Sequence, residues 1–174
     1  EVFFDGAFLA DDALPGGVVL GDVGQGWSVA MATTSSERGL TLRAPGRFTA
    51  TADRLVDLYR THADVPDGID PGLRDRVVQA WMEAEAYRLQ TLQTVTDDAE
   101  GRSAGAASSF VKLWWSELDV TLHETALDIL GPEAELDSAW SKGWQFALSG
   151  PIYAGTNEIQ RNIAAERVLG LPRK

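Results

Sequence analysis

The sequence predicts an all-α protein, an antiparallel helical bundle preceded by a short remnant of a β domain. Three observations lead to this prediction. Glycine and proline become sparse after Gly26, and apolar residues then recur at helical spacing. The segments between these periodic stretches are short, as in antiparallel bundles. The chain of 174 residues is long enough for one domain with a sizeable core.

Residues 1–24 differ from the rest of the chain. The stretch EVFFDGAFL contains two strand-like pieces around Asp5-Gly6, and the stretches ADDALPGG and GDVGQG are rich in turn residues. The chain also opens on a strand-like segment without a methionine, so we expect a piece of a longer protein. We therefore expect residues 1–24 to be the end of a β domain with its linker, and residues 25–174 to be the helical bundle domain.

The first helical region begins after Gly26, and Pro45-Gly46 interrupts it. We expect a kink or a short break there, because proline removes one helix hydrogen bond and clashes with the preceding turn. The second helix is predicted from about Pro71 to Asp98, with Asp70 as its N-cap.

The third helix is predicted to reach about Leu130, where Gly131-Pro132 stops it. A shorter helix covers 138–148, and a last helix begins after Thr156, which can cap it, and ends at Gly170. The apolar stripes expected to face the core are Leu73, Val77, Trp81, Ala84, Arg88 and Leu92 on the second helix, and Phe110, Trp114, Leu118, Leu122, Ala126 and Ile129 on the third.

Composition and charge exclude several kinds of function. The formal net charge of -11 argues against a nucleic-acid surface and against binding to anionic lipid. No apolar run is long enough to cross a bilayer, and no secretory signal opens the chain. The absence of cysteine excludes disulfides and thiolate metal sites. We expect His62 and His123 on helix surfaces or loops rather than in a metal site.

Glu37-Arg38 is the one catalytic candidate that the residues suggest without further comparison. The pair sits in a predicted helix beside small and apolar neighbours, where a carboxylate can have a raised pKa and act as a base. An ordinary ion pair on a helix explains the same two residues, and from the pair alone it is the preferred interpretation.

The tail IYAGTNEIQRNIAAERVLGLPR resembles the C-terminal signature of the acyl-CoA dehydrogenase family. The opening VFFDGAFLADDALPG, the GQGW entry and a long helix carrying Glu-Arg are similar to the family as well, and KLWWSEL and ALDILG resemble actinobacterial members. The resemblance covers essentially the whole chain and corresponds to the second half of such an enzyme. It implies α,β-dehydrogenation of an acyl-CoA thioester with FAD, an electron-transfer flavoprotein as acceptor, a homo- or hetero-tetramer, and a cytoplasmic location in a GC-rich actinobacterium.

The resemblance also implies where the catalytic base lies. Many members carry a glutamate between the tyrosine and the Gly-Thr of the tail, where this chain has Ala154. A minority, resembling the isovaleryl and long-chain types, carries the glutamate in the first long helix, followed by arginine, as in Glu37-Arg38. Glu37 is then the base that removes the α proton. Arg38, Tyr153, Ala154 and Gly155 would line the substrate site.

The implied FAD contacts are Thr156 and Glu158. Many relatives have glutamine at the second position, and a carboxylate there can accept hydrogen bonds from ribose hydroxyls but repels phosphate. Two features that members use to reach a neighbouring subunit's FAD are missing: an Arg-x-x-Phe-Gly segment, and a glutamine at the position of Asp128. These losses raise the alternative of one subunit in a heteromeric dehydrogenase, similar to steroid side-chain dehydrogenases of actinobacteria.

Two further alternatives remain open from the sequence. One is a non-catalytic bundle that serves oligomerisation, and the other is a related flavoenzyme of the same fold with a different substrate. We expect the chain by itself to be inactive and to lack stoichiometric FAD, because much of the flavin and substrate pocket would lie in the other half of such an enzyme.

Overall fold

The computed structural model describes most of the chain as two compact units, residues 1–39 and 40–174, and each is considered by itself. The described residues are 3, 5–10, 12–14, 17–36, 44–63, 70–102 and 105–173, and for residues 33–36 only the backbone is described.

The first unit contains helix α1 (Gly26–Ser36), which begins where the sequence predicts a helix. The described residues before it form turns, bends and irregular backbone, with no strand among them. A strand needs a neighbour that pairs with its backbone groups, and the described residues provide none. Phe3, Phe8 and Trp27 are largely exposed, so the described part of this unit has no core of its own. The proposed division at residue 24 stays a prediction.

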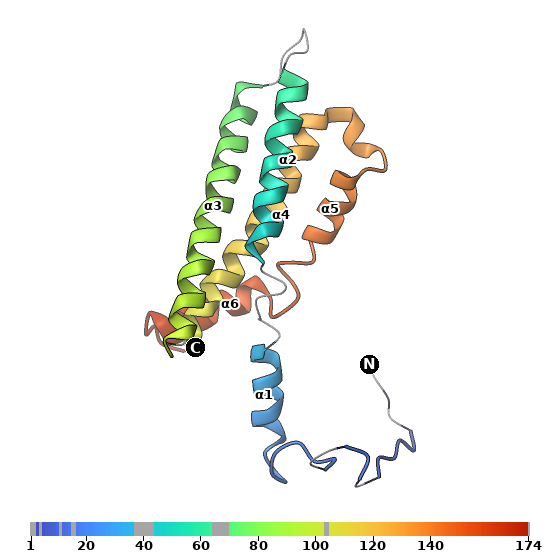
Figure 1. Ribbon diagram of the computed structural model, residues 1–174, viewed down its shortest axis with the longest axis vertical. Helices are drawn as coiled ribbons and strands as arrows, with labels where there is room; N and C mark the ends of the chain where they lie inside the picture. Colours follow the sequence, from blue (N-terminus) through green and yellow to red (C-terminus); the bar gives the residue numbers. More distant parts are fainter. Residues whose placement is uncertain are drawn as a thin grey trace. The chain divides into compact units, whose positions relative to one another are not determined.

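The second unit is built on three long helices, α2 (Pro45–Ala63), α3 (Pro71–Ala99) and α4 (Ser108–Leu130), which lie side by side with alternating direction (Figure 1). Pro45 is the first residue of α2, where its missing N–H costs no helix hydrogen bond. Asp70 caps α3 by accepting a hydrogen bond from the Gly72 N–H at 2.9 Å. The prediction of an antiparallel all-α bundle is confirmed.

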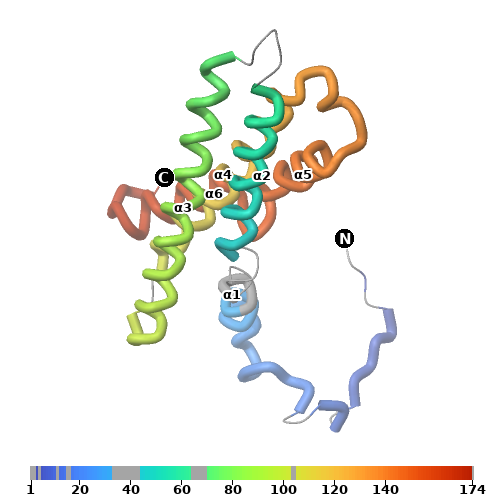
Figure 2. Tube along the Cα trace, turned by 45° about the horizontal axis from the view of Figure 1, so that its top comes forward, coloured from blue at the N-terminus to red at the C-terminus, as the bar shows by residue number. Residues whose placement is uncertain are grey.

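Helix α4 is the centre of the second unit. It packs against α2 and α3 and also against α5 (Ala139–Ala147) and α6 (Asn157–Ile163), which surround it in Figure 2. The predicted stop of α4 is confirmed, because Gly131 ends it with a φ of 55°. Single turns complete the unit: the 3-10 helices η1 (Gly105–Ala107) and η2 (Gly131–Glu135), and the π-helical turn η3 (Ala164–Val168).

The core joins α2, α3 and α4 through edge-to-face aromatic contacts. The ring of Tyr87 lies 5.2 Å from that of Phe48 and 5.8 Å from that of Trp114. Four residues of the predicted stripes do not belong to this core. Trp81, Leu92 and Phe110 are exposed, and Arg88 is partly exposed and pairs with Glu85. The buried stripe of α3 consists instead of Val77, Ala80, Ala84, Tyr87 and Thr91.

The error on α3 has a physical reason. This helix carries apolar residues on two adjoining faces, and helical periodicity alone does not say which one meets its neighbours. The buried face contains Ala80 and Ala84, whose small side chains let helices approach closely. No helix among the described residues is long and apolar enough to cross a membrane.

Candidate functional site

The residues that the sequence assigns to the site fall in two places. Glu37 and Arg38 lie outside the described residues, so their role as base and neighbour stays a prediction. The other five, Tyr153 to Thr156 and Glu158, lie in the turn between α5 and α6 and in the first turn of α6. These five residues are neighbours in the sequence, and their roles toward substrate and flavin stay predictions.

The turn that carries Ala154 has an unusual backbone. Ala154 has a φ of 55°, the only positive value of a residue other than glycine among the described residues, and Gly155 follows with a φ of 87°. An L-residue in this left-handed region costs on the order of 1–2 kcal/mol, so the surrounding contacts must hold it there. The fully buried Gln160 supplies one such contact, because its Nε2 donates to the Ala154 carbonyl oxygen at 3.2 Å.

Gly155 is required by the same side chain. A Cβ added to Gly155 would lie 2.5 Å from Gln160 Nε2, closer than real Cβ atoms come to a neighbour. Gly155 therefore has a structural role in the turn, because a larger residue would collide with Gln160 and would disfavour the φ of 87°. The Oε1 atom of Gln160 is buried and has no hydrogen-bond partner.

Thr156 caps α6, as predicted, with its hydroxyl oxygen accepting from the Ile159 N–H at 3.3 Å. The Glu158 carboxylate is exposed and folds back onto the same helix start. Hydrogen bonds from its own backbone N–H and from the Thr156 hydroxyl hold the pKa of Glu158 below its usual value, and the charges of Arg161 and Lys112 lower it further. Glu158 is therefore an anion in this fold.

The family resemblance implies a flavin cofactor, and the groups at the start of α6 can be compared with the parts of such a cofactor. The first amides of α6 already have partners within the chain: the Asn157 N–H donates to the Pro151 carbonyl oxygen, and Thr156 and Glu158 take two others. A phosphate would meet a carboxylate there instead of free amides. The acceptor oxygens of Glu158 suit a hydroxyl-bearing part of the cofactor, such as a ribose or ribityl chain, and do not suit the pyrophosphate.

Tyr153, which the resemblance places near substrate, has its ring in the bundle. The ring lies 5.6 Å from that of Trp115 on α4. The phenolic oxygen is buried and makes no hydrogen bond of normal geometry, although it feels the charges of Arg47 and Asp119. Burial raises the pKa of Tyr153, so the phenol stays neutral.

A buried charged cluster that sequence analysis missed lies beside this tyrosine. Arg47, in the first turn of α2, forms an ion pair with Asp119 of α4, whose side chain is only 2% exposed. His123 lies one turn further along α4, with Nδ1 3.4 Å from the second carboxylate oxygen. We call Arg47, Asp119, His123 and Tyr153 the Asp119 cluster.

The electrostatics of the Asp119 cluster are dominated by burial. Burial raises the pKa of Asp119, although the positive charge of Arg47 and the nearby His123 lower it. One oxygen of this carboxylate, Oδ1, makes no hydrogen bond. The guanidinium of Arg47 also lies over the rings of Phe48 and Phe146, at 5.3 and 5.2 Å from their centroids.

His123 corrects a prediction, because it is buried rather than on a helix surface or loop. Its Nδ1 donates to the Asp119 carbonyl oxygen at 2.8 Å, and its ring packs edge-on against Trp140 of α5. Residues 119 and 123 are four apart and each follows a core leucine, and this spacing is the signal that could have revealed the cluster. Among the described residues no group of acidic residues and histidines could hold a metal ion.

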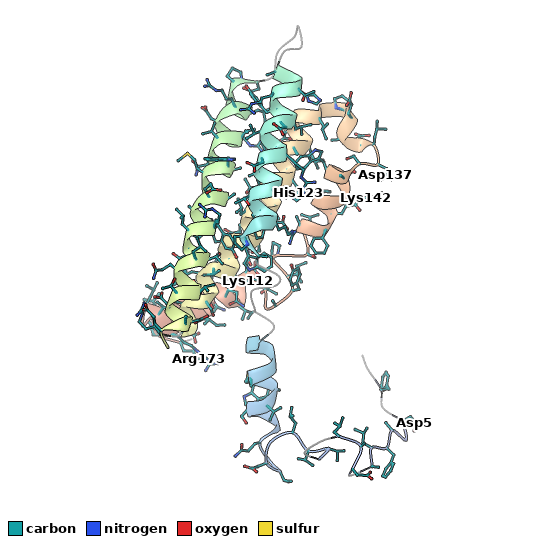
Figure 3. All side chains as sticks on the ribbon, in the orientation of Figure 1. Asp5, Lys112, His123, Asp137, Lys142 and Arg173 are labelled. Carbon is teal, nitrogen blue, oxygen red and sulfur yellow. The ribbon has the colours of Figure 1, made fainter. Side chains whose placement is uncertain are left out.

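A second buried polar group fastens the start of α6 to α4. Lys112 Nζ donates to Asn157 Oδ1 at 2.7 Å, and the hydroxyl of Ser116 donates to the same oxygen at 3.1 Å. Asn157 Nδ2 donates to Glu117 Oε1 at 3.2 Å, and Arg161 pairs with the same carboxylate. We call these five residues the Asn157 network. Figure 3 shows Lys112 near the α6 end of α4 and His123 further along it, beside α5.

Asp128, at the position where relatives carry a glutamine, is also engaged within the chain. Its carboxylate pairs with Arg76 of α3 at 2.5 Å.

A separate surface groove of about 460 Å³ lies between α2 and α3 and shares no residue with the Ala154 turn. Its lining residues are Asp53, Val56, Asp57, Arg60, Val78 and Trp81.

Comparison with known proteins identifies relatives along the whole chain. Residues 24–169 match the family described as acyl-CoA dehydrogenase, C-terminal domain. Acyl-CoA dehydrogenase IpdE1 of Mycobacterium tuberculosis is 39% identical over 181 residues, which cover 100% of this chain and 44% of that protein. Its namesake from Mycolicibacterium smegmatis is 38% identical over 181 residues, covering 100% of this chain and 43% of that protein.

Solved structures share the fold. The Tcur3481-Tcur3483 steroid ACAD superposes with a TM-score of 0.75 at 19% identity, over 88% of this chain and 42% of that one. The chain therefore spans less than half the length of the relatives that it matches.

Proposed function

Because this chain belongs to the acyl-CoA dehydrogenase family, we propose that it is the C-terminal part of an FAD-dependent enzyme that dehydrogenates an acyl-CoA thioester between its α and β carbons. The observation that carries the proposal is the Ala154 turn. Its strained backbone, its glycine and the Thr156 cap are all present, while the side chain at the usual position of the base has no proton acceptor.

Glu37 is the base in this proposal. Its carboxylate takes the α proton, and the thioester carbonyl must receive hydrogen bonds that stabilise the negative charge that develops on it. Arg38 is a neighbour that orients the site or tunes the pKa of the base. Tyr153, Ala154 and Gly155 line the substrate, where an alanine leaves room beside the reacting carbon.

Thr156 and Glu158 would hold the hydroxyl-bearing part of the flavin, because their oxygen atoms can accept hydrogen bonds from hydroxyl groups. When bound, the flavin supplies the acceptor for the β hydrogen, which leaves with its electron pair. An electron-transfer flavoprotein is the proposed next acceptor. The assembly is a homo- or hetero-tetramer, and the location is the bacterial cytoplasm.

One observation favours the heteromeric form of this enzyme. The residue that replaces the cross-subunit glutamine, Asp128, is paired with Arg76 in its own subunit and carries a negative charge that a neighbour's pyrophosphate would repel. This chain would then supply the base while a partner supplies the contacts across the interface. FAD per chain, measured with and without a co-encoded partner, tests this form; full flavin loading of the homomer would end it.

The test of the base uses the complete enzyme and anaerobic bleaching of its flavin by octanoyl-CoA, isovaleryl-CoA and a steroid-derived acyl-CoA. We expect Glu37→Gln to slow bleaching by about 10²–10⁴-fold, the usual contribution of a positioned base, with flavin content unchanged. Glu135→Gln, at an exposed carboxylate, is the matched control and should behave as wild type.

A rescue sharpens the same test. Adding Ala154→Glu to the Glu37→Gln enzyme returns a carboxylate to the position used by other members, so part of the lost rate should return. If Glu37→Gln bleaches at the wild-type rate, Glu37 is not the base, and the non-catalytic alternative gains support.

A further inference from the structure

Asn157 closes the turn that carries Ala154. Its backbone N–H donates to the Pro151 carbonyl oxygen at 2.8 Å, so the two ends of the turn are joined. The left-handed Ala154 and Gly155 lie within this closed segment, and Thr156, which caps α6, directly precedes Asn157. Any contact that fixes Asn157 therefore also restrains the neighbouring residues that the family resemblance assigns to substrate and flavin.

Helix α4 holds the Asn157 side chain at both ends of its amide. The Oδ1 atom accepts from Lys112 Nζ at 2.7 Å and lies 3.1 Å from the Ser116 hydroxyl. The Nδ2 atom donates to Glu117 Oε1 at 3.2 Å. Asn157 is only 4% exposed, and an amide with partners on both its oxygen and its nitrogen is held in one orientation. The side chain thus ties the end of the turn to a defined place on α4.

The beginning of the turn lies against the same part of α4. A Cβ added to Gly150 would lie 3.3 Å from the ring of Trp115 and 3.4 Å from the Ser116 Cβ, so the backbone approaches α4 closely at this glycine. Tyr153, within the turn, packs its ring against Trp115 as well. Ser116 therefore lies beside Gly150 and beside Asn157, the two residues that flank the turn.

Lys112 is buried although it carries a charge. It is only 2% exposed, and lysine is rarely buried so completely, because the ammonium loses its water. Apolar contacts between α4 and α6 could fasten the two helices without this loss, but such contacts have no preferred direction. The hydrogen bond from a charged donor is short and directional, which favours a role for Lys112 in placing Asn157.

We propose that Asn157 is a positioning residue, held by Lys112 and Ser116 of α4, which fixes the Ala154 turn and Thr156 in the place where they act on substrate and flavin. What this says of turnover rests on the proposed function. The placement of the turn is a property of the fold and is measured separately.

The experiment removes this restraint from the complete enzyme with Lys112→Met and Asn157→Leu in one variant. Methionine and leucine are close in size to the residues that they replace, and removing donor and acceptor together avoids leaving one of them buried without the other. Ser116 keeps a partner in the Leu113 carbonyl oxygen at 3.0 Å, and Glu117 keeps its ion pair with Arg161.

The matched control is Lys142→Met with Asp137→Leu, which removes an exposed ion pair at α5. Hydrogen exchange of the peptide over residues 150–157 reports on the turn. Anaerobic bleaching by octanoyl-CoA, expressed per bound FAD, reports on turnover. The control should behave as wild type in both measurements.

We expect exchange over residues 150–157 to become about tenfold faster in the Lys112/Asn157 variant, with exchange in α2 and α3 unchanged. Bleaching per bound FAD should fall about 10- to 100-fold, because small misplacements at a reacting centre are costly. Asn157→Asp keeps an oxygen that accepts from Lys112, so both measurements should stay within about twofold of wild type. Ser116→Ala removes one donor and should make exchange over residues 150–157 about threefold faster.

Wild-type exchange over residues 150–157, or an increase shared equally by the whole bundle, would overturn the assignment, and so would wild-type bleaching in the Lys112/Asn157 variant. If that variant does not fold, the presence or absence of the local increase in Ser116→Ala decides the question. If no acyl-CoA of the panel bleaches the wild-type enzyme, the proposed function fails, and hydrogen exchange still decides whether Asn157 holds the turn.

Discussion

The Asn157 network and the Asp119 cluster both contain residues of helix α4, yet they satisfy their polar atoms differently. In the Asn157 network both ends of the asparagine amide are used: two donors reach its oxygen and its nitrogen donates to a carboxylate. In the Asp119 cluster a carboxylate oxygen and a phenolic oxygen are buried without a hydrogen bond.

The two groups therefore differ in how much their buried polar side chains contribute to stability. A network whose members are all hydrogen-bonded stabilises one arrangement strongly, because any break leaves a costly buried group. A cluster with unsatisfied buried atoms contributes less to stability, because each such atom has lost its water without gaining a partner.

The largest expected effect comes from breaking the Asn157 network. Asn157→Ala removes an acceptor of the buried Lys112 ammonium and of the Ser116 hydroxyl, and we expect the free energy of unfolding to fall by about 2–4 kcal/mol. Urea unfolding followed by circular dichroism measures it. Asn162→Ala, at an exposed position of the same helix, is the control and should change stability by less than about 0.5 kcal/mol. A small effect of Asn157→Ala would remove the contrast between the two groups.

The next effect tests how tightly the Asp119 cluster is packed. A Cβ added at Gly143 of α5 would lie 2.3 Å from His123 Nε2, so Gly143→Ala must displace the imidazole or the helix. We expect a loss of about 1–3 kcal/mol, the usual cost of overpacking. Gly46→Ala, where an added Cβ meets nothing within 4 Å, should be neutral or stabilising. Equal behaviour of the two variants in thermal unfolding would contradict the packing seen at His123.

A smaller effect concerns pH. The raised pKa of Asp119 favours the neutral carboxyl in the folded protein, so its contribution to stability is complete below the unfolded pKa of about 3.9 and is lost as pH rises through the higher folded value. An amide in its place does not ionise, so the stability of Asp119→Asn relative to wild type should increase as pH rises above about 4. Urea midpoints of both proteins across this range measure the difference. A difference that shrinks with rising pH would indicate that the ion pair with Arg47 outweighs burial.

The smallest expected effect is at the turn itself. Ala154→Gly relieves a left-handed alanine at the cost of a more flexible unfolded chain, and we expect a net gain of about 0.5 kcal/mol. Ala86→Gly, on an exposed face of α3, should instead lose about 1 kcal/mol. Melting temperatures of both variants test the pair of values, and a destabilised Ala154→Gly would show that the turn is not strained.

Much of the fold could be read from local signals. Pro45 at the start of α2, Asp70 before α3, Gly131 after α4 and Thr156 before α6 each mark a helix end through their own backbone or side-chain chemistry. These signals act within a few residues, so a sequence displays them directly. The tail motif similarly identified the family and the residues of the Ala154 turn.

The parts that were missed depend on residues far apart in the chain. Phe110 and Trp81 look like core residues by periodicity but are exposed, because the neighbouring helices cover a different face. His123 was expected on a helix surface or in a loop. Its burial depends on helices that pack around α4, and the carboxylate beside it pairs with Arg47, which lies 72 positions earlier in α2. Sequence spacing shows which residues share a face but not which face is buried.

The sequence by itself determined an acidic, all-α chain with its helix boundaries, its family, and a tail whose usual base position holds Ala154. Only the tertiary structure decided that Tyr153 packs its ring against Trp115, that Gly155 lies against Gln160, and that Glu158 folds back on its own helix. The physical reason is that capping and periodicity are local properties of the chain. Burial, pKa shifts and the strain of a turn come from contacts between segments that the sequence keeps apart.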